Sequence, residues 1–283
     1  RAGGAGKVKV KGDYPVDKFA KLMQDIGILW EKYRMMYLNG MLNTLGLALA
    51  ATAIGCVIGL LCGILNTIPC AKNDPLPKRI LLKLLRVIIR IYVEVFRGTP
   101  MIVQAVVIYY GAQYAGVFMD TTFAAVFIIS INTGAYMAEI IRGGIVSVDK
   151  GQFEAAHAIG MTHWQTMTTV VLPQAIRNIL PSVGNELIVN IKDSSVLNVI
   201  SVSELFFQAK SAAGTYYRYF EVYFIIAVIY LILTLTVSRI LRAVEKKMDG
   251  PDNYVIHGSQ SDRRADIKVS VENEKEAVKR WNA

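Results

Sequence analysis

Histidine and cysteine are scarce in this 283-residue chain, which contains three of each. The histidines form no H-E-x-x-H or H-x-x-E-H pair, so the chain lacks the signature of an intramembrane metalloprotease. Cys56 and Cys62 are six residues apart in a stretch expected to be helical, which is too far for a disulfide. A G-x-x-x-x-G-K-S/T phosphate-binding loop is also missing. We therefore expect this chain to have no ATPase or other enzyme activity and to hold no cofactor or metal.

Uncharged stretches, by contrast, are long and frequent. Hydrophobic residues make up 53% of the chain, and its mean hydropathy is +0.38. Several apolar runs reach the roughly 20 residues that a helix needs to cross a bilayer. We predict an all-α membrane protein whose five spans cover about residues 41–68, 99–117, 121–141, 178–201 and 219–241.

Basic residues predict the orientation of these spans. The connection 68–91 carries six Lys or Arg against one Asp, which places it in the cytoplasm by the positive-inside rule. The stretch between the second and third spans contains neither Lys nor Arg and should be outside. Alternation then places 142–177 and the C-terminus inside, and 203–218 outside. The net charge of +9 therefore reflects topology, and nothing in its distribution indicates nucleic acid binding.

Three regions follow from this pattern. Segment 1–37 lies outside although it carries eight basic against four acidic residues, and its apolar residues recur at helical spacing. That spacing predicts an amphipathic helix on the membrane surface, with its lysines facing lipid headgroups. Residues 38–247 form the predicted transmembrane domain. Residues 248–283 hold seven acidic and six basic side chains with few aliphatic ones, which predicts a solvated, partly disordered cytoplasmic tail.

Small residues line one face of the first predicted span. Ala51, Gly55, Gly59 and Gly63 recur every four residues, a spacing that lets another helix approach closely. The stripe fits contact with a helix of the same chain and contact with a second subunit equally well.

Polar residues recur on the third and fourth predicted spans. Asn132, Tyr136 and Glu139 share one helical face, and Glu186, Asn190 and Asp193 share another. A charge at the bilayer centre costs on the order of 2.5–3.5 kcal/mol, so such residues either pair or line a cavity. Two interpretations remain open: local pairing of the acids with Arg142 and Lys192, or a substrate path. Pro181 and the run from Gly98 to Pro100 interrupt the helical hydrogen bonding, which is tolerated beside a cavity.

The connection 142–177 contains a motif with a fixed spacing. Glu154, Ala155 and Ala156 are followed after three residues by Gly160 and, nine residues later, by the run Val170-Val171-Leu172-Pro173. Residues 152–159 are predicted to form a short amphipathic helix that stops at a left-handed Gly160. A capping box from Thr162 to Gln165 then starts a second helix, which Pro173 interrupts.

This spacing resembles the EAA loop of the membrane subunits of ABC importers, with Val170 where isoleucine is more usual. The resemblance to the polar amino acid permease branch of that family covers roughly residues 35–245. The matching runs, in the expected order, are Phe96-Arg97-Gly98-Thr99-Pro100 with Gln104, Tyr136 to Ile145, Leu172-Pro173-Gln174-Ala175, Gly184-Asn185-Glu186, Lys192-Asp193-Ser194-Ser195 and Val202-Ser203-Glu204-Leu205.

The resemblance implies a type I ABC importer permease with a five-helix core, multi-pass in the bacterial cell membrane. Such a permease pairs with a second permease subunit, identical or similar, and receives an amino acid from an extracytoplasmic binding protein. Separate ATPase subunits, which hold ATP and Mg, would dock on the EAA loop and drive alternating access. The coupling residues by the motif are Glu154, Ala155, Ala156 and Gly160.

For the substrate path we predict one set on the fourth span and a facing set. A zwitterion needs an acceptor for its ammonium group and donors for its carboxylate. The predicted residues are Glu186, Asn190, Asp193 and Ser194, facing Arg97, Thr99 and Asn132. The alternatives are a permease for another small solute, such as an osmolyte or an opine, and a passive channel or membrane scaffold.

Overall fold

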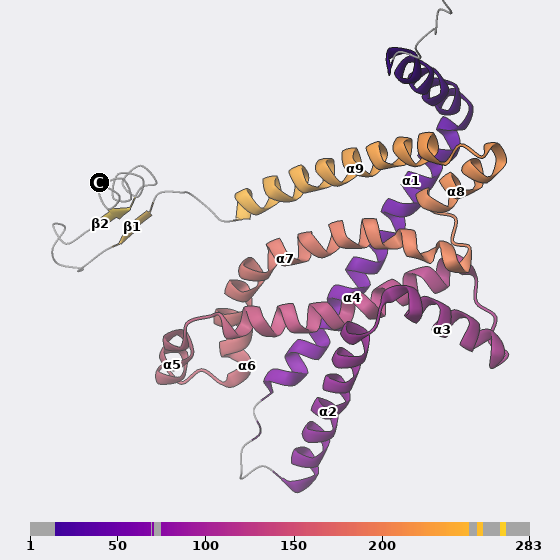
Figure 1. Cartoon of the computed structure of the whole chain (residues 1–283). Coiled ribbons are helices and arrows are strands. Elements are labelled where there is room, and N and C mark those ends of the chain that lie inside the picture. The colour runs from indigo at the N-terminus through magenta and orange to yellow at the C-terminus, as the bar shows by residue number, and fades with distance from the viewer. Residues whose placement is uncertain (1–14, 69, 71–74, 249–253, 257–266, 270–283) are drawn as a thin grey trace, which may run out of the picture. The chain divides into compact units, whose positions relative to one another are not determined.

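The computed structural model describes residues 15–68, 70, 75–248, 254–256 and 267–269. Its elements follow the chain in the order shown in Figure 1. They are α1 (Pro15–Thr67), α2 (Leu76–Gly98), α3 (Met101–Tyr114), α4 (Thr121–Val146), α5 (Lys150–Ala158), α6 (His163–Gln165), the π-helix η1 (Thr166–Val171), α7 (Leu172–Asp193), the 3-10 helix η2 (Ser194–Ile200), α8 (Leu205–Tyr216), α9 (Tyr219–Met248), β1 (Tyr254–Ile256) and β2 (Ile267–Val269).

The predicted all-α class is confirmed for the membrane part of the chain. In the predicted tail, β1 and β2 pair antiparallel with Val255 opposite Lys268, a feature that the composition did not indicate. The remaining tail and residues 1–14 lie outside the described residues. The chain divides into two compact units, residues 1–143 with 182–237 and residues 144–181 with 238–283.

Three helices are long and apolar enough to cross a membrane: Lys18–Thr67, Thr121–Val146 and Tyr219–Lys247. They overlap the first, third and fifth predicted spans. The other two predicted spans are also largely helical, but α3 has 14 residues and is about 21 Å long, shorter than a hydrocarbon core of about 30 Å. The fourth span consists of α7 followed by η2. The count of five spans therefore stays a prediction.

Helix α2 occupies most of the connection that separates the first two predicted spans. Its basic and apolar residues recur on opposite faces, which stabilises a helix at an interface. The helix ends where Pro100 follows Thr99, because a residue before proline is driven into the extended conformation. Thr99 has φ −120° and ψ 144°, and Pro100 starts α3.

The glycine stripe of α1 packs against α4 of the same chain. A Cβ atom on Gly55 would lie 2.7 Å from the Thr133 side chain, and one on Gly63 would lie 2.7 Å from that of Ile141. Gly59 faces Met137 with even less room. The absence of side chains therefore lets the two backbones approach. Of the two interpretations left open by the sequence, the structure supports contact within one chain.

The N-terminal part of α1 packs on α8 and α9 (Figure 1). Leu29 and Tyr37 are buried in a cluster with Leu205 and Val222. Asp25 forms an ion pair with Arg218, and Lys32 donates a hydrogen bond to the Tyr216 hydroxyl. Segment 1–37 is helical from Pro15 on, as part of one helix that continues into the first predicted span, and its location on the membrane surface stays a prediction. Its contact with the 203–218 connection agrees with a location of both on one side of the membrane.

Candidate functional site

Helix α5 carries the Glu154 motif and is capped at both ends. The Asp149 side chain accepts a hydrogen bond of 2.6 Å from the Gly151 N–H at its start. Gly160 follows its end with φ +81°, and its N–H donates to the His157 carbonyl at 3.0 Å. Glycine occupies this left-handed conformation without the steric cost that a Cβ atom brings. The predicted helix and its glycine stop are both confirmed.

The second helix also begins as predicted. The Thr162 hydroxyl accepts from the Gln165 N–H at 3.3 Å, and the Gln165 side chain accepts from the Thr162 N–H at 2.9 Å. The prediction that Pro173 interrupts this helix was wrong. The helix continues to Asp193, because a π-helical stretch precedes the proline and widens the turn, with the Leu172 N–H donating to the Met167 carbonyl five residues back.

The motif residues of α5 differ in exposure: one is buried and the others face outward. Ala156 is 4% exposed, on the side where α5 packs against η1, whose buried residues are Thr166, Met167 and Val171. Glu154 and Ala155 are exposed, as is Gly160. Two large apolar side chains near them are also exposed, Ile159 at 76% and Trp164 at 66%. Sequence analysis missed these two, although large apolar residues in a polar connection were a readable signal.

Most of the predicted path residues line a cavity of about 470 Å³ in the unit formed by residues 1–143 and 182–237. Its lining includes six of the seven: Arg97, Thr99, Asn132, Glu186, Asn190 and Asp193. The seventh, Ser194, does not line it. Its side chain is fully buried and donates to the Ile191 carbonyl at 2.9 Å, where it caps the end of α7. We call this space the pathway cavity.

Gln104 holds the broken backbone at one wall of the pathway cavity. Its side-chain N–H₂ donates to the carbonyls of Phe96 and Thr99 at 2.8 and 2.9 Å, and its oxygen accepts from Asn132 at 2.9 Å. Carbonyls at the end of α2 have no helical partner, and leaving them unpaired at membrane depth would be costly. The sequence signal was a lone polar residue four positions after Pro100 in an apolar helix.

Asn190 ties three helices together. Its amide N–H₂ donates to the Thr52 hydroxyl on α1 at 2.8 Å, and its amide oxygen accepts from the Thr133 hydroxyl on α4 at 3.1 Å. The residue is 3% exposed. A buried and fully paired amide fixes the position of α7 next to the charged residues of the cavity.

Both signs of charge face the pathway cavity. The Arg97 guanidinium lies 5.3 Å from the centre of the Tyr136 ring, within cation–π range. Within the described part of the chain, no ion pair engages Glu186 or Asp193. Glu139, by contrast, pairs with Arg142 at 2.8 Å, so the local pairing interpretation is confirmed for that acid. The arrangement offers two carboxylates and one guanidinium to a small polar molecule.

A family model described as the binding-protein-dependent transport system inner membrane component matches residues 78–250. The chain belongs to this family. The glutamine transport system permease protein GlnP of Escherichia coli (strain K12) is 38% identical over 226 residues, which cover 79% of this permease and 97% of that protein. The putative GlnP of Rickettsia felis is 37% identical over 215 residues, covering 76% of this permease and 93% of that protein.

Solved structures agree with this placement. The crystal structure of an amino acid ABC transporter with histidines shares 41% sequence identity with this permease, and the match has a TM-score of 0.68. It covers 76% of this chain and 95% of that chain. The inward-facing MetNI methionine ABC transporter, at 21% identity and a TM-score of 0.63, shows the fold alone. This permease is thus of the type I ABC importer class, in the polar amino acid branch.

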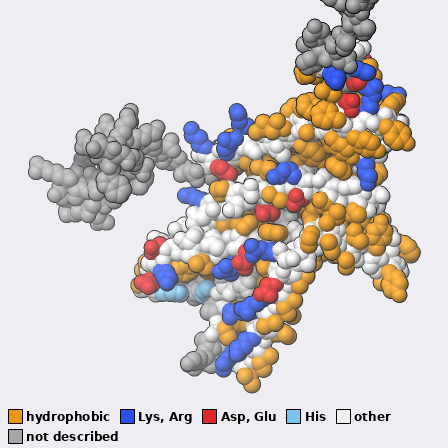
Figure 2. All heavy atoms as spheres, in the orientation of Figure 1, with side chains coloured by type: hydrophobic (Ala, Val, Ile, Leu, Met, Phe, Trp, Pro, Cys, Tyr) orange, Lys and Arg blue, Asp and Glu red, His pale blue; other side chains and the backbone are white. Residues whose placement is uncertain are grey.

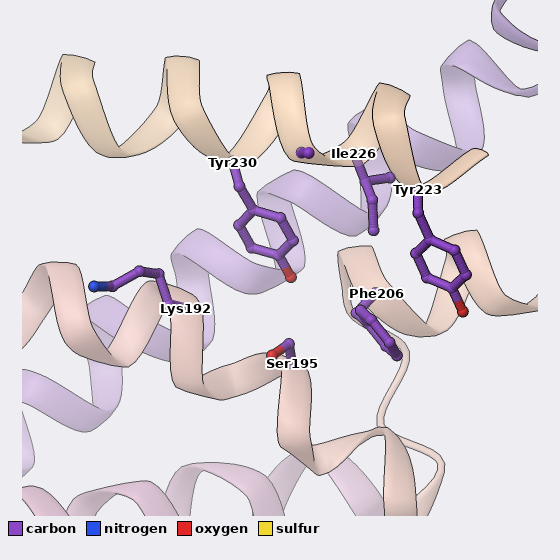
Figure 3. A pocket seen from close by; sticks show the side chains of 7 residues that line it. Lys192, Ser195, Phe206, Tyr223, Ile226 and Tyr230 are labelled. Carbon is purple, nitrogen blue, oxygen red and sulfur yellow. The ribbon is translucent and has the colours of Figure 1, made fainter. Parts of the chain in front are cut away.

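Lys192 faces a different space from its neighbour Asp193 in this permease. It lines a smaller cavity of about 260 Å³ between α7, α8 and α9, together with Ser195, Phe206, Tyr223, Ile226, Ala227 and Tyr230 (Figure 3). In the portion that the structure describes, Lys192 and Asp193 form no ion pair. The local pairing interpretation therefore does not hold for Asp193.

Proposed function

We propose that this permease imports a polar or charged amino acid by alternating access in the bacterial cell membrane, which it crosses several times. The single observation that carries the proposal is the pathway cavity, which combines two carboxylates with a guanidinium in a permease of the amino acid branch. The names of its relatives support the same substrate class, since they include glutamine permeases and an amino acid transporter.

The chemistry of the cavity fits a zwitterion. The α-ammonium group would bind the carboxylates of Glu186 and Asp193, and the α-carboxylate would bind the planar fork of Arg97. A volume of about 470 Å³ lies within the range of small-molecule sites, roughly 300–1,000 Å³. Asn132 and Thr99 add neutral polar groups to the wall.

The energy for transport would come from other subunits. ATPase subunits that bind ATP and Mg would dock on the exposed face of α5, with Glu154 and Ala155 at the contact. The buried Ala156 would hold α5 against η1, and Gly160 would set the sharp turn into the next helix. A second permease subunit and an extracytoplasmic binding protein would complete the importer, and lipid would surround it.

Asp193→Asn tests the assignment of the pathway cavity. The substitution keeps the size of the side chain and removes a charge that would bind the ammonium group. A charge-assisted hydrogen bond contributes roughly 1.5–3 kcal/mol, so uptake should fall at least about tenfold. The measurement is ATP-driven amino acid uptake by the complex in reconstituted vesicles, with Glu31→Gln as a control that removes an exposed carboxylate of α1 that does not line the cavity.

Wild-type uptake in the Asp193→Asn protein would refute the assignment of this residue. A wild-type complex that takes up an osmolyte or an opine, and none of the amino acids in a panel, would refute the substrate class instead. Solute flux without ATP would favour the passive channel.

A further inference from the structure

Helix α2 presents a basic stripe. Five Lys or Arg residues recur at helical spacing along one face: Arg79, Lys83, Arg86, Arg90 and Arg97. The opposite face exposes large aliphatic side chains, among them Ile80, Leu84 and Ile91. In Figure 2 the blue side chains follow α2 along one edge and the orange ones follow the other. A helix with this pattern places its apolar face in lipid and its basic face toward protein or water.

A second cavity lies along the C-terminal half of this stripe, from Arg86 to Arg97. It has a volume of about 570 Å³, and its charged lining consists of Arg86, Arg90, Arg97, Arg142, Glu94 and Glu139. We call it the arginine cavity. Four cations against two anions leave it with a net charge of +2. Because Glu139 already pairs with Arg142, the remaining three arginines face a single carboxylate.

Arg86 is a half-buried cation in the wall of the arginine cavity. One end of its guanidinium donates to the Ile68 carbonyl, but its Nε atom is buried and has no hydrogen-bond partner. A buried Nε offers no surface to a ligand, so Arg86 contributes its positive charge to the cavity lining and not a free hydrogen-bond donor at Nε. Arg90 is exposed to the same space. The arrangement suits a carboxylate, which guanidinium groups bind in a two-pronged geometry.

Arg97 lines both cavities, so the arginine cavity adjoins the pathway cavity. From Arg97 to Arg86 the stripe covers about 16 Å of helix, in the direction of the predicted cytoplasmic end. We propose that the arginine cavity is an inward station that binds the α-carboxylate of the substrate after it leaves the pathway cavity. This rests on the proposed import of amino acids. Several weak sites in series let a ligand leave, whereas one tight site would retain it.

The test uses inhibition by accumulated product. Vesicles containing the whole complex are first assayed for uptake of L-glutamine, L-arginine and L-histidine, and the amino acid that is transported fastest becomes the probe. That amino acid is then loaded inside the vesicles at increasing concentration. In the wild type, internal probe should slow uptake. In Arg90→Gln, about tenfold more internal probe should be needed for the same inhibition, because a charge-assisted contact to the carboxylate is lost.

Two controls make the result specific. Lys83→Gln removes a cation from the same stripe that does not line the cavity, so its inhibition should match the wild type. The α-amide of the probe lacks the carboxylate, so loading it inside should inhibit the wild type only as weakly as the probe inhibits Arg90→Gln. Both outcomes together support the inward station.

Three results would overturn it. One is a wild type without inhibition by internal probe, and another is equal inhibition of the wild type and Arg90→Gln. The third is an Arg90→Gln effect that appears in vesicles with phosphatidylglycerol and vanishes in pure phosphatidylcholine, which would assign the cavity to a lipid headgroup. In each case normal amino acid uptake by the wild type would leave the proposed function standing, whereas a wild type that transports none of a full panel of polar and charged amino acids would refute that function.

Discussion

At the scale of single residues, missing side chains are as informative as charged ones. Gly55, Gly59 and Gly63 bring the backbone of α1 against α4, and each would place a Cβ atom inside van der Waals contact. Gly46 lies on the same helix with open space where its side chain would be. Gly46 falls outside the four-residue spacing that Gly55, Gly59 and Gly63 share, and its surroundings differ accordingly.

Gly59→Ala should therefore destabilise the protein, and Gly46→Ala should not. Overpacking costs typically about 1–3 kcal/mol in the free energy of unfolding, whereas alanine in an open helical position gains about 0.5–1 kcal/mol over glycine. The measurement is thermal unfolding in detergent, with a lower Tm for Gly59→Ala. Equal Tm values for the two variants would mean that α1 and α4 separate easily.

At the scale of elements, local signals predicted most of the helices near the site. Capping residues and the glycine stop placed α5 and the start of α6 correctly, because caps are satisfied by residues a few positions away. The passage of the helix through Pro173 was missed, because η1 depends on a π-type hydrogen-bond pattern that the composition does not encode. The basic residues of α2 indicate orientation by their number, and their helical spacing also predicts a basic stripe on one face.

Asp120 provides an element-scale prediction. Its carboxylate accepts from the Thr122 and Phe123 N–H groups at 2.9 and 3.2 Å and caps the start of α4. The backbone hydrogen bonds from Phe123 and Thr122 lower the pKa of Asp120. Since the folded pKa lies below the unfolded value of about 3.9, its stabilisation is present above that pH and is lost as the pH falls through the folded pKa.

Hydrogen exchange at the first amides of α4 measures this effect. In the wild type, protection should weaken on acidification, whereas Asp120→Asn should keep a cap whose strength does not vary over the same range, because asparagine also caps helices. Asp120→Ala should exchange fast at every pH. A wild type with constant protection down to pH 2 would contradict the role of the carboxylate.

At the scale of the whole molecule, helix α5 with the Glu154 motif and the pathway cavity belong to different compact units of one chain. Helix α7 runs from Leu172, which belongs to the end of the motif, to Asp193, which lines the cavity, so a single element carries residues of both. Transport would require that a displacement of α5 also moves the residues that line the pathway cavity.

Gly160→Val tests that requirement. Valine resists a positive φ because its branched Cβ collides with the backbone, at a cost of at least about 1–2 kcal/mol. We expect normal insertion with loss of transport and of substrate-stimulated ATPase activity in vesicles. Gly116→Val is the matched control, since Gly116 has φ +80° and lies in the predicted outer connection. If both variants lose activity equally, or neither does, α5 has no special role in coupling.

The sequence by itself determined the membrane class, the expected orientation and the spacing of the Glu154 motif, because apolar length, charge bias and residue spacing are local properties of the chain. It also predicted the residues of the path, because charged side chains at membrane depth are costly unless they pair or line a cavity. Tertiary structure decided which of them share a cavity: six gather there, Ser194 turns into the packing, and Lys192 and Asp193 face different cavities although they are neighbours. It also decided that the glycines of α1 face a helix of the same chain, because contacts between distant residues depend on packing that no local pattern records.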